Sequence, residues 1–308
     1  MERQNIELNE KGYLVIDDAV SPEEINRAHE ICMQYWYTYF TNRDMKQKDI
    51  ELDFKNKSKT NPYFPSKRGT PMYKAMYGNV SKAGKEYMNT RKPANSQSCG
   101  MGRATSQPEV YHDTALNQIR ENLRPIFNAL YGSPTCMQLE RFGLKLPVKS
   151  SKDMVCHTDM SYMEKYQTER PPRRKLTDPV SYAPYSDDGV PQRLQAVLCL
   201  SDSDAGWYGY EGAHHKYKEI GEMLEWPGVT KSIQKIDPDI MDKLGLQRID
   251  IPSKRGRLII WNCGIPHGNT KVKNTTPRLA LYVNFQPYEK DCMAPKVIGL
   301  GNNLKEKK

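Results

Sequence analysis

The chain has 308 residues, of which 37% are hydrophobic, and a formal net charge of +9. This length suits one large domain, and we expect a single domain over residues 1–308. The mean hydropathy of −0.79 and the short apolar runs exclude a bundle of membrane-spanning helices, and the charged N-terminal segment is not typical of a signal peptide.

The seven cysteines are scattered along the chain and form no CxxC pair. This usage is typical of free thiols in a reducing compartment, so we expect a cytoplasmic protein. The positive charge permits an anionic partner without requiring one.

The first well-defined unit of the chain reads GYLVIDDAVSPEEINRAHE. Val15 and Ile16 follow a glycine and favour a strand. Ser21 is a good N-cap residue, Pro22 suits the first helical position, and Glu24 completes a capping box. We therefore expect a short strand followed by an amphipathic helix.

The next stretch, about residues 41–110, is polar, rich in Lys, Asn, Ser, Pro and Gly, and shows little periodicity. We expect an insertion of loops and short helices there. A helix is predicted from Asp113 to Gly132, with a kink before Pro125, and the sequence CMQLERFGLKLP then predicts a strand.

The second half of the chain contains several strand-like runs, which include MVCHTDMSY, LQAVLCLSD, RIDIPSKRGRLIIW around Gly256, and PRLALYVNF. Helices first and strands later predict an α+β fold. Between the first two runs, residues 163–193 are charged and rich in proline, with a basic cluster at 170–175. We expect a lid loop there, although an ordinary solvated loop has the same composition.

His157 and Asp159 stand two residues apart in one of these runs. Residues i and i+2 of a strand point to the same face, so the imidazole and the carboxylate should converge. This pair suits a divalent iron, and a third ligand would complete a facial triad with open positions. Alone, an HxD pair is a weak signal, because a simple ion pair has the same sequence.

Two later residues strengthen the metal interpretation. His267 follows an apolar strand and precedes Gly268, which would allow close approach to a metal. Arg278 opens the last strand eleven residues further on. If it points inward, it is a costly buried charge unless it meets a carboxylate, for example that of a dicarboxylate cosubstrate. A turn histidine and a solvated arginine remain the simpler alternatives.

Taken together, these motifs resemble the phytanoyl-CoA dioxygenase-like family of iron(II)/2-oxoglutarate oxygenases. The resemblance spans about residues 11–37 and 113–286, and EGAHHKY departs from the family's Pro-Gly-Ser-His segment at Glu211 and Ala213. It implies a double-stranded β-helix, a cupin-like jelly roll flanked by N-terminal helices. It also implies that His157, Asp159 and His267 bind Fe(II) and that Arg278 holds 2-oxoglutarate.

The resemblance implies further roles more weakly. Lys145, Asn269 and Gln195 would line the cosubstrate pocket. His214 would be a structural residue near the core. Because adjacent residues of a strand face opposite ways, we expect that His214 and His215 do not serve one site.

The implied activity is that of an oxidoreductase, a hydroxylase that converts 2-oxoglutarate and O₂ to succinate and CO₂ while it hydroxylates an organic small molecule. A carboxylate at Asp159 leaves no vacancy for chloride, so we expect hydroxylation or desaturation rather than halogenation. One alternative is an oxygenase acting on nucleic acid or protein, motivated by the net charge, although no nucleic-acid-binding motif is present. Another is a non-catalytic binding module. We expect no membrane partner.

Overall fold

The computed structural model describes residues 2–41, 108–145, 153–159, 193–225, 234–273 and 276–287. Apart from their ends, the expected insertion at 41–110 and the expected lid at 163–193, with its basic cluster, lie outside these residues. Within the described ranges, no helix combines the length and the apolar character that crossing a membrane requires. The five cysteines in these ranges are free.

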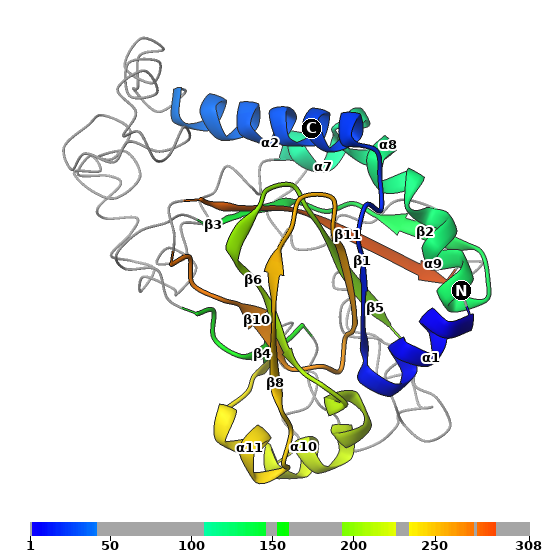
Figure 1. Ribbon diagram of the computed structural model, residues 1–308, viewed down its shortest axis with the longest axis vertical. Helices are drawn as coiled ribbons and strands as arrows, with labels where there is room; N and C mark the ends of the chain where they lie inside the picture. The colour runs from blue at the N-terminus through cyan, green and yellow to red at the C-terminus, as the bar shows by residue number, and fades with distance from the viewer. Residues whose placement is uncertain are drawn as a thin grey trace, which may run out of the picture.

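Two antiparallel sheets form the centre of the molecule (Figure 1). The first has the order β1 (Tyr13–Ile16), β9 (Leu258–Asn262), β5 (Leu194–Cys199), β11 (Arg278–Pro287) and β2 (Thr135–Gln138), and β3 (Phe142–Lys145) also pairs with β11. The second has the order β7 (Gln234–Lys235), β4 (His157–Thr158), β10 (His267–Asn269), β6 (Ser203–Tyr210) and β8 (Arg248–Ser253).

Successive strands often change sheets. β8 and β9 flank the predicted turn at Gly256, whose φ is +85°, yet β8 pairs with β6 in the second sheet and β9 pairs with β5 in the first. The chain then passes to β10 in the second sheet and to β11 in the first. This alternation between two facing antiparallel sheets fits a jelly-roll-like α+β fold, in agreement with the predicted fold class at that level.

The first sheet has a helix-covered face and an inner face. Helices α2 (Pro22–Thr41), α7 (Pro108–His112), α8 (Thr114–Asn122) and α9 (Arg124–Tyr131) pack on its outer side (Figure 1). Alternate side chains of β11 join this larger core: Leu279, Leu281, Val283 and Phe285. The intervening residues, Arg278, Ala280 and Tyr282, therefore face the second sheet.

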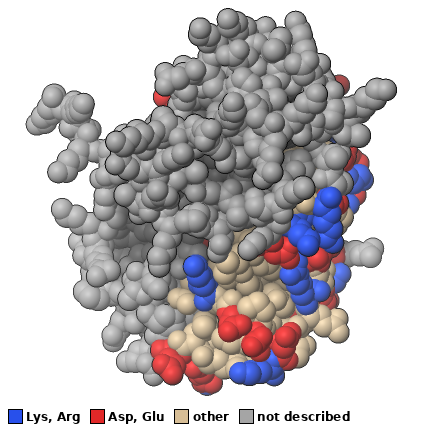
Figure 2. Space-filling model, turned by 90° about the vertical axis from the view of Figure 1, so that its left-hand side faces the viewer, with Lys and Arg blue, Asp and Glu red and all other residues tan. Residues whose placement is uncertain are grey.

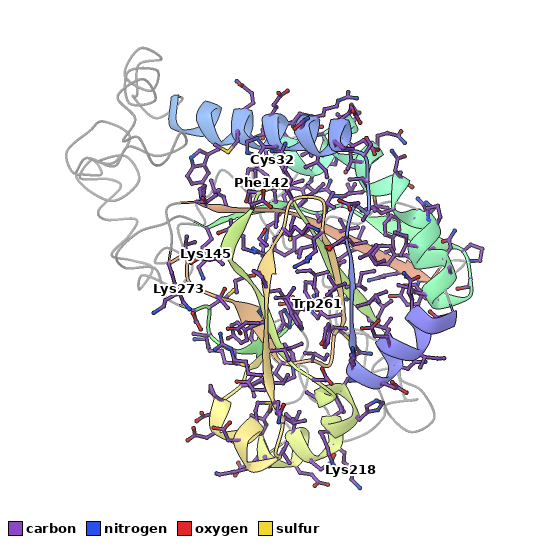
Figure 3. The ribbon with its side chains drawn as sticks, in the orientation of Figure 1. Cys32, Phe142, Lys145, Lys218, Trp261 and Lys273 are labelled. Carbon is purple, nitrogen blue, oxygen red and sulfur yellow. The ribbon has the colours of Figure 1, made fainter. Side chains whose placement is uncertain are left out.

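The space between the sheets holds an aromatic and aliphatic cluster. Trp207 from the second sheet packs there with Val197, Ile259 and Trp261 from the first. Figure 3 shows Trp261 between the sheets, whereas Phe142 lies on the side of α2. Side chains on this inner face can thus approach one another from both sheets.

The second sheet has its own outer cover. Tyr208 and Tyr210 of β6 pack with Cys156 against Ile220 and Met241, which belong to α10 (Tyr217–Met223) and α11 (Pro238–Lys243). A 3₁₀ helix (Ala213–Lys216) precedes α10, and α1 (Glu2–Lys11) precedes β1.

Local sequence signals explain most helix ends. Ser21 and Glu24 form the predicted capping box, with reciprocal backbone-to-side-chain hydrogen bonds of 2.9 and 3.2 Å. The helix expected from Asp113 is interrupted at Leu123, just before Pro125, and ends at Gly132 with φ +63°. The single strand expected from CMQLERFGLKLP is instead two strands, because the extended strand is interrupted at residues 139–141.

Candidate metal centre

The antiparallel pairing of β4 with β10 places two histidines side by side. His157 and His267 are direct partners in register, and their ring centroids are 4.7 Å apart. Asp159 follows just beyond β4, with carboxylate oxygens 3.5 Å from Nε2 of His157 and 3.8 Å from Nε2 of His267. One ligand atom from each of the three residues lies within 4.8 Å of the others. The structure thus brings together the three residues that the sequence singled out.

Backbone carbonyls set the tautomers of both histidines. Nδ1 of His157 lies 2.8 Å from the carbonyl oxygen of Val155, and Nδ1 of His267 lies 2.9 Å from that of Ile265. Because a carbonyl oxygen can only accept a hydrogen bond, each Nδ1 carries the proton. Each Nε2 then keeps a free lone pair directed at Asp159, which is the arrangement of metal-ligating histidines.

The electrostatics of the group favour the same protonation states. Burial raises the pKa of Asp159, but the neighbouring His157 and His267 and a hydrogen bond from Gln195 outweigh it, so the net pKa is lowered. Burial and the neighbouring His157 lower the pKa of His267. At neutral pH the group therefore offers a carboxylate and a neutral imidazole, which a divalent cation requires.

Gln195 connects the carboxylate to the wall of the site. Its Nε2 donates to Oδ2 of Asp159 at 2.6 Å, and its Oε1 accepts from the indole Nε1 of Trp261 at 3.1 Å. Gln195 and Trp261 are register partners on β5 and β9. The amide that the sequence placed in a cosubstrate pocket thus orients the candidate metal ligand. The hydrogen bond from Trp261 to this amide was not predicted from the sequence.

Arg278 and Lys145 form a buried positive pair. They are register partners on β11 and β3, and each residue is only 1% exposed. Nε and Nη1 of Arg278 are buried and have no hydrogen-bond partner among the described residues. Such an unpaired guanidinium leaves a vacant two-point donor site on the inner face.

Asn269 contacts Lys145 through its backbone carbonyl rather than through its side chain. Its carbonyl oxygen accepts from Nζ of Lys145 at 3.0 Å and from the amide of Met154 at 2.8 Å. Its side-chain Nδ2 lies 3.5 Å from the sulfur of Met154. Asn269 thereby ties the cationic pair to the strand that carries His267.

The expectation that His214 and His215 face opposite ways is wrong. They lie in a 3₁₀ helix rather than a strand, their rings are 3.9 Å apart, and both Nε2 atoms approach the carbonyl oxygen of Asn9 at 2.9 and 2.7 Å. His214 is 1% exposed and fastens α1 against this helix, which agrees with the predicted structural role.

Arg141 is a residue near the site that the sequence reading missed. Its guanidinium carbon lies 5.4 Å from the centre of the Tyr282 ring, which is on the inner face of β11, and its charge contributes to the lowered pKa of Asp159. Strand alternation back from Lys145, through Gly143 to Arg141, was the signal that could have found it.

Comparisons with known proteins add structural likenesses. The chain matches no protein-family model and no curated protein. Among solved structures it is similar to AviO1 from Streptomyces viridochromogenes Tue57, with 12% identity, a TM-score of 0.46 and coverage of 96% of this chain and 97% of that one. EctD from S. alaskensis, solved with bound Fe, gives 13% identity and a TM-score of 0.47 over 93% and 76% of the two chains.

A third similar structure is SnoK, described as a non-heme alpha ketoglutarate dependent carbocyclase from nogalamycin biosynthesis. It shows 13% identity and a TM-score of 0.44 over 98% of this chain and 94% of that one. At this level of similarity these structures do not assign the chain to a family.

Proposed function

We propose that the chain is a non-haem iron(II)- and 2-oxoglutarate-dependent dioxygenase of the phytanoyl-CoA dioxygenase-like type, which hydroxylates an organic small molecule. The observation that carries the proposal is the convergence of His157, Asp159 and His267, whose ligand atoms lie within 4.8 Å of one another. Two imidazole Nε2 atoms and one carboxylate on one side of a metal are the facial triad, which leaves positions open for a cosubstrate and oxygen.

The residues around the triad fit 2-oxoglutarate. A buried guanidinium without an acceptor is costly, and Nε and Nη1 of Arg278 are in that state. A carboxylate would accept two parallel hydrogen bonds from it. Lys145, paired with Arg278 across the two strands, adds a second positive charge, so this end of the inner face suits a dianion better than a neutral ligand.

When bound, iron and 2-oxoglutarate supply oxidative decarboxylation, in which 2-oxoglutarate and O₂ give succinate and CO₂ and one oxygen atom enters the substrate. The residues of the chain would hold and orient these groups. His157 and His267 donate their Nδ1 protons to backbone carbonyls, which leaves both Nε2 atoms available as ligands. Gln195 fixes the direction of the Asp159 carboxylate. Trp207 and Trp261, with ring centroids 5.6 Å apart, form an aromatic wall beside the ring of His267.

The carboxylate of Asp159 also bears on the outcome of the reaction. Because the carboxylate of Asp159 would occupy one coordination position of the metal, that position is not open to chloride. The proposed outcome is therefore hydroxylation or desaturation rather than halogenation.

The described surface favours a small molecule over nucleic acid. Figure 2 shows acidic and basic side chains intermixed on the described part of one face. Several basic side chains are already paired: Lys254 and Arg257 with Asp17, and Arg248 with Asp153. A nucleic-acid site would instead need a continuous basic surface free to meet phosphates.

Anaerobic titration with Fe(II) and then 2-oxoglutarate tests the proposal. We expect a weak visible absorption band for the wild type and for His112→Ala, a control at an exposed histidine of α7. His267→Ala should lose the band. In air, the wild type and His112→Ala should release succinate and His267→Ala should not. If the wild type gave no band, the proposal would fail and a non-catalytic binding module would be favoured.

A further inference from the structure

The segment from Arg141 through β3 carries a basic residue at each end of its inner face. Lys145 lies opposite Arg278, and Gly143 lies opposite Ala280 in the register of β3 with β11. Arg141 continues the alternation, because its carbonyl oxygen accepts from the backbone amide of Tyr282 at 3.1 Å. The two ends are four residues, or about 13 Å, apart. Glycine contributes no side chain to the space between them.

The backbone at Arg141 is held in place from behind. Arg120, which is 0% exposed, donates to the carbonyl oxygens of Glu140 at 2.7 Å and Tyr282 at 2.9 Å. The carboxylate of Glu140 accepts from Asn284 at 2.9 Å and from the amide of Arg141 at 3.2 Å. Arg141 is thus presented by a fixed loop, which reduces the entropy lost when its side chain binds a ligand.

The Arg141 guanidinium is a second cation on this face whose donors no described residue uses. It stacks over Tyr282 and is half-buried, and among the described residues its side chain makes no hydrogen bond or ion pair. Tyr282 pairs with Val197 on the inner face, and Gln195 of the same strand reaches Asp159 from that face, so Arg141 lies on the side of the candidate metal centre. A partly desolvated arginine on an aromatic ring is a favourable partner for a planar or tetrahedral anion.

The cosubstrate does not account for Arg141. In the proposed function the distal carboxylate of 2-oxoglutarate meets Arg278, at the other end of the β3–β11 pair. Resting on that proposed function, we propose that Arg141 binds an anionic group of the primary substrate, a carboxylate or a phosphate, and so orients the substrate at the metal. The substrate class is then that of organic acids or phosphate monoesters.

Matched probes test this inference without knowledge of the natural substrate. Hexanoate, hexyl phosphate and neutral hexanamide are titrated anaerobically into the protein loaded with Fe(II) and saturating 2-oxoglutarate, and the change in the visible band is followed. We expect at least one of the two anions to bind roughly tenfold or more tightly than the amide, and Arg141→Gln to remove that difference. Arg141→Lys should keep part of it, because the charge stays and the planar fork is lost.

Two controls make the outcome specific. Arg27→Gln, at an exposed arginine of α2, should bind the probes as the wild type does, and near-ultraviolet circular dichroism checks the fold of each variant.

Equal binding of anions and amide, or no binding of any probe, overturns the inference while the band itself still supports the proposed function. Weaker iron binding in Arg141→Gln with unchanged anion preference would show that Arg141 only supports Asp159. Absence of the band in the wild type is the separate failure of the proposed function.

Discussion

Substitution of Arg278 should stabilise the ligand-free protein and weaken the binding of 2-oxoglutarate. Its Nε and Nη1 are buried without partners among the described residues, and each unsatisfied buried group costs about 1–3 kcal/mol. Arg278→Met keeps much of the side-chain length and removes the charge. Without ligand, we therefore expect the variant to be more stable than the wild type by about 1–3 kcal/mol.

The same change should weaken cosubstrate binding. Removal of one partner from a buried, hydrogen-bonded charge pair costs about 2–5 kcal/mol, so the dissociation constant of 2-oxoglutarate should rise roughly thirty-fold or more. Arg278→Lys keeps the charge and loses the two-point geometry, and its rise should be smaller. Iron affinity should change little, because Arg278 is not a proposed ligand.

Urea unfolding with and without 2-oxoglutarate measures both effects in one assay. A ligand at about one hundred times its dissociation constant stabilises the folded state by about 2.7 kcal/mol. After a thirty-fold loss of affinity, the same concentration stabilises Arg278→Met by only about 0.9 kcal/mol. Arg27→Met, at an exposed position, is the control and should stay within about 0.5 kcal/mol of the wild type.

Two results would refute this reasoning. If ligand-free Arg278→Met were less stable than the wild type, the guanidinium would have an acceptor in the free protein. If 2-oxoglutarate still stabilised Arg278→Met in full, the cosubstrate would bind elsewhere, and the metal centre would use another co-reactant.

Three other variants examine the supports of the site. Asp159→Gly should open a coordination position and allow azide to bind the metal, seen as a new absorption band that the wild type lacks. Gln195→Leu removes the 2.6 Å donor to Asp159 and should lower iron affinity about 10- to 100-fold in a chelator competition; an unchanged affinity would show that the amide is dispensable. Arg120→Met removes a donor from the carbonyl oxygens of Glu140, Arg141 and Tyr282 and should cost about 2–4 kcal/mol in urea unfolding, whereas an unchanged midpoint would mean that water replaces the guanidinium.

Local signals in the sequence predicted local structure well. The capping box at Ser21, the helix interruption before Pro125 and the strand turn at Gly256 depend on a few neighbouring residues, and the structure confirms each of them. The pairing of β8 and β9 with different sheets depends on contacts far apart in the sequence. No local pattern contains that information.

The failure at His214 and His215 has the same physical origin. Alternation is a property of an extended strand, and the prediction applied it to residues that form a 3₁₀ helix. With about three residues per turn, adjacent side chains diverge by only about 120°, so both rings can meet one carbonyl oxygen. A wrong secondary structure therefore became a wrong statement about side-chain direction.

Arg141 shows the opposite case, in which a sound rule was applied to too few residues. Lys145 was predicted to line the pocket, and strand alternation then places Gly143 and Arg141 on the same inner face. What the sequence lacked was a reason for Arg141 to stay on that face. The reason is tertiary, because Tyr282 supports its guanidinium and Arg120 holds the loop behind it. An inward arginine thus becomes a candidate for anion binding only when its neighbours both fix its position and leave its hydrogen-bond donors unused.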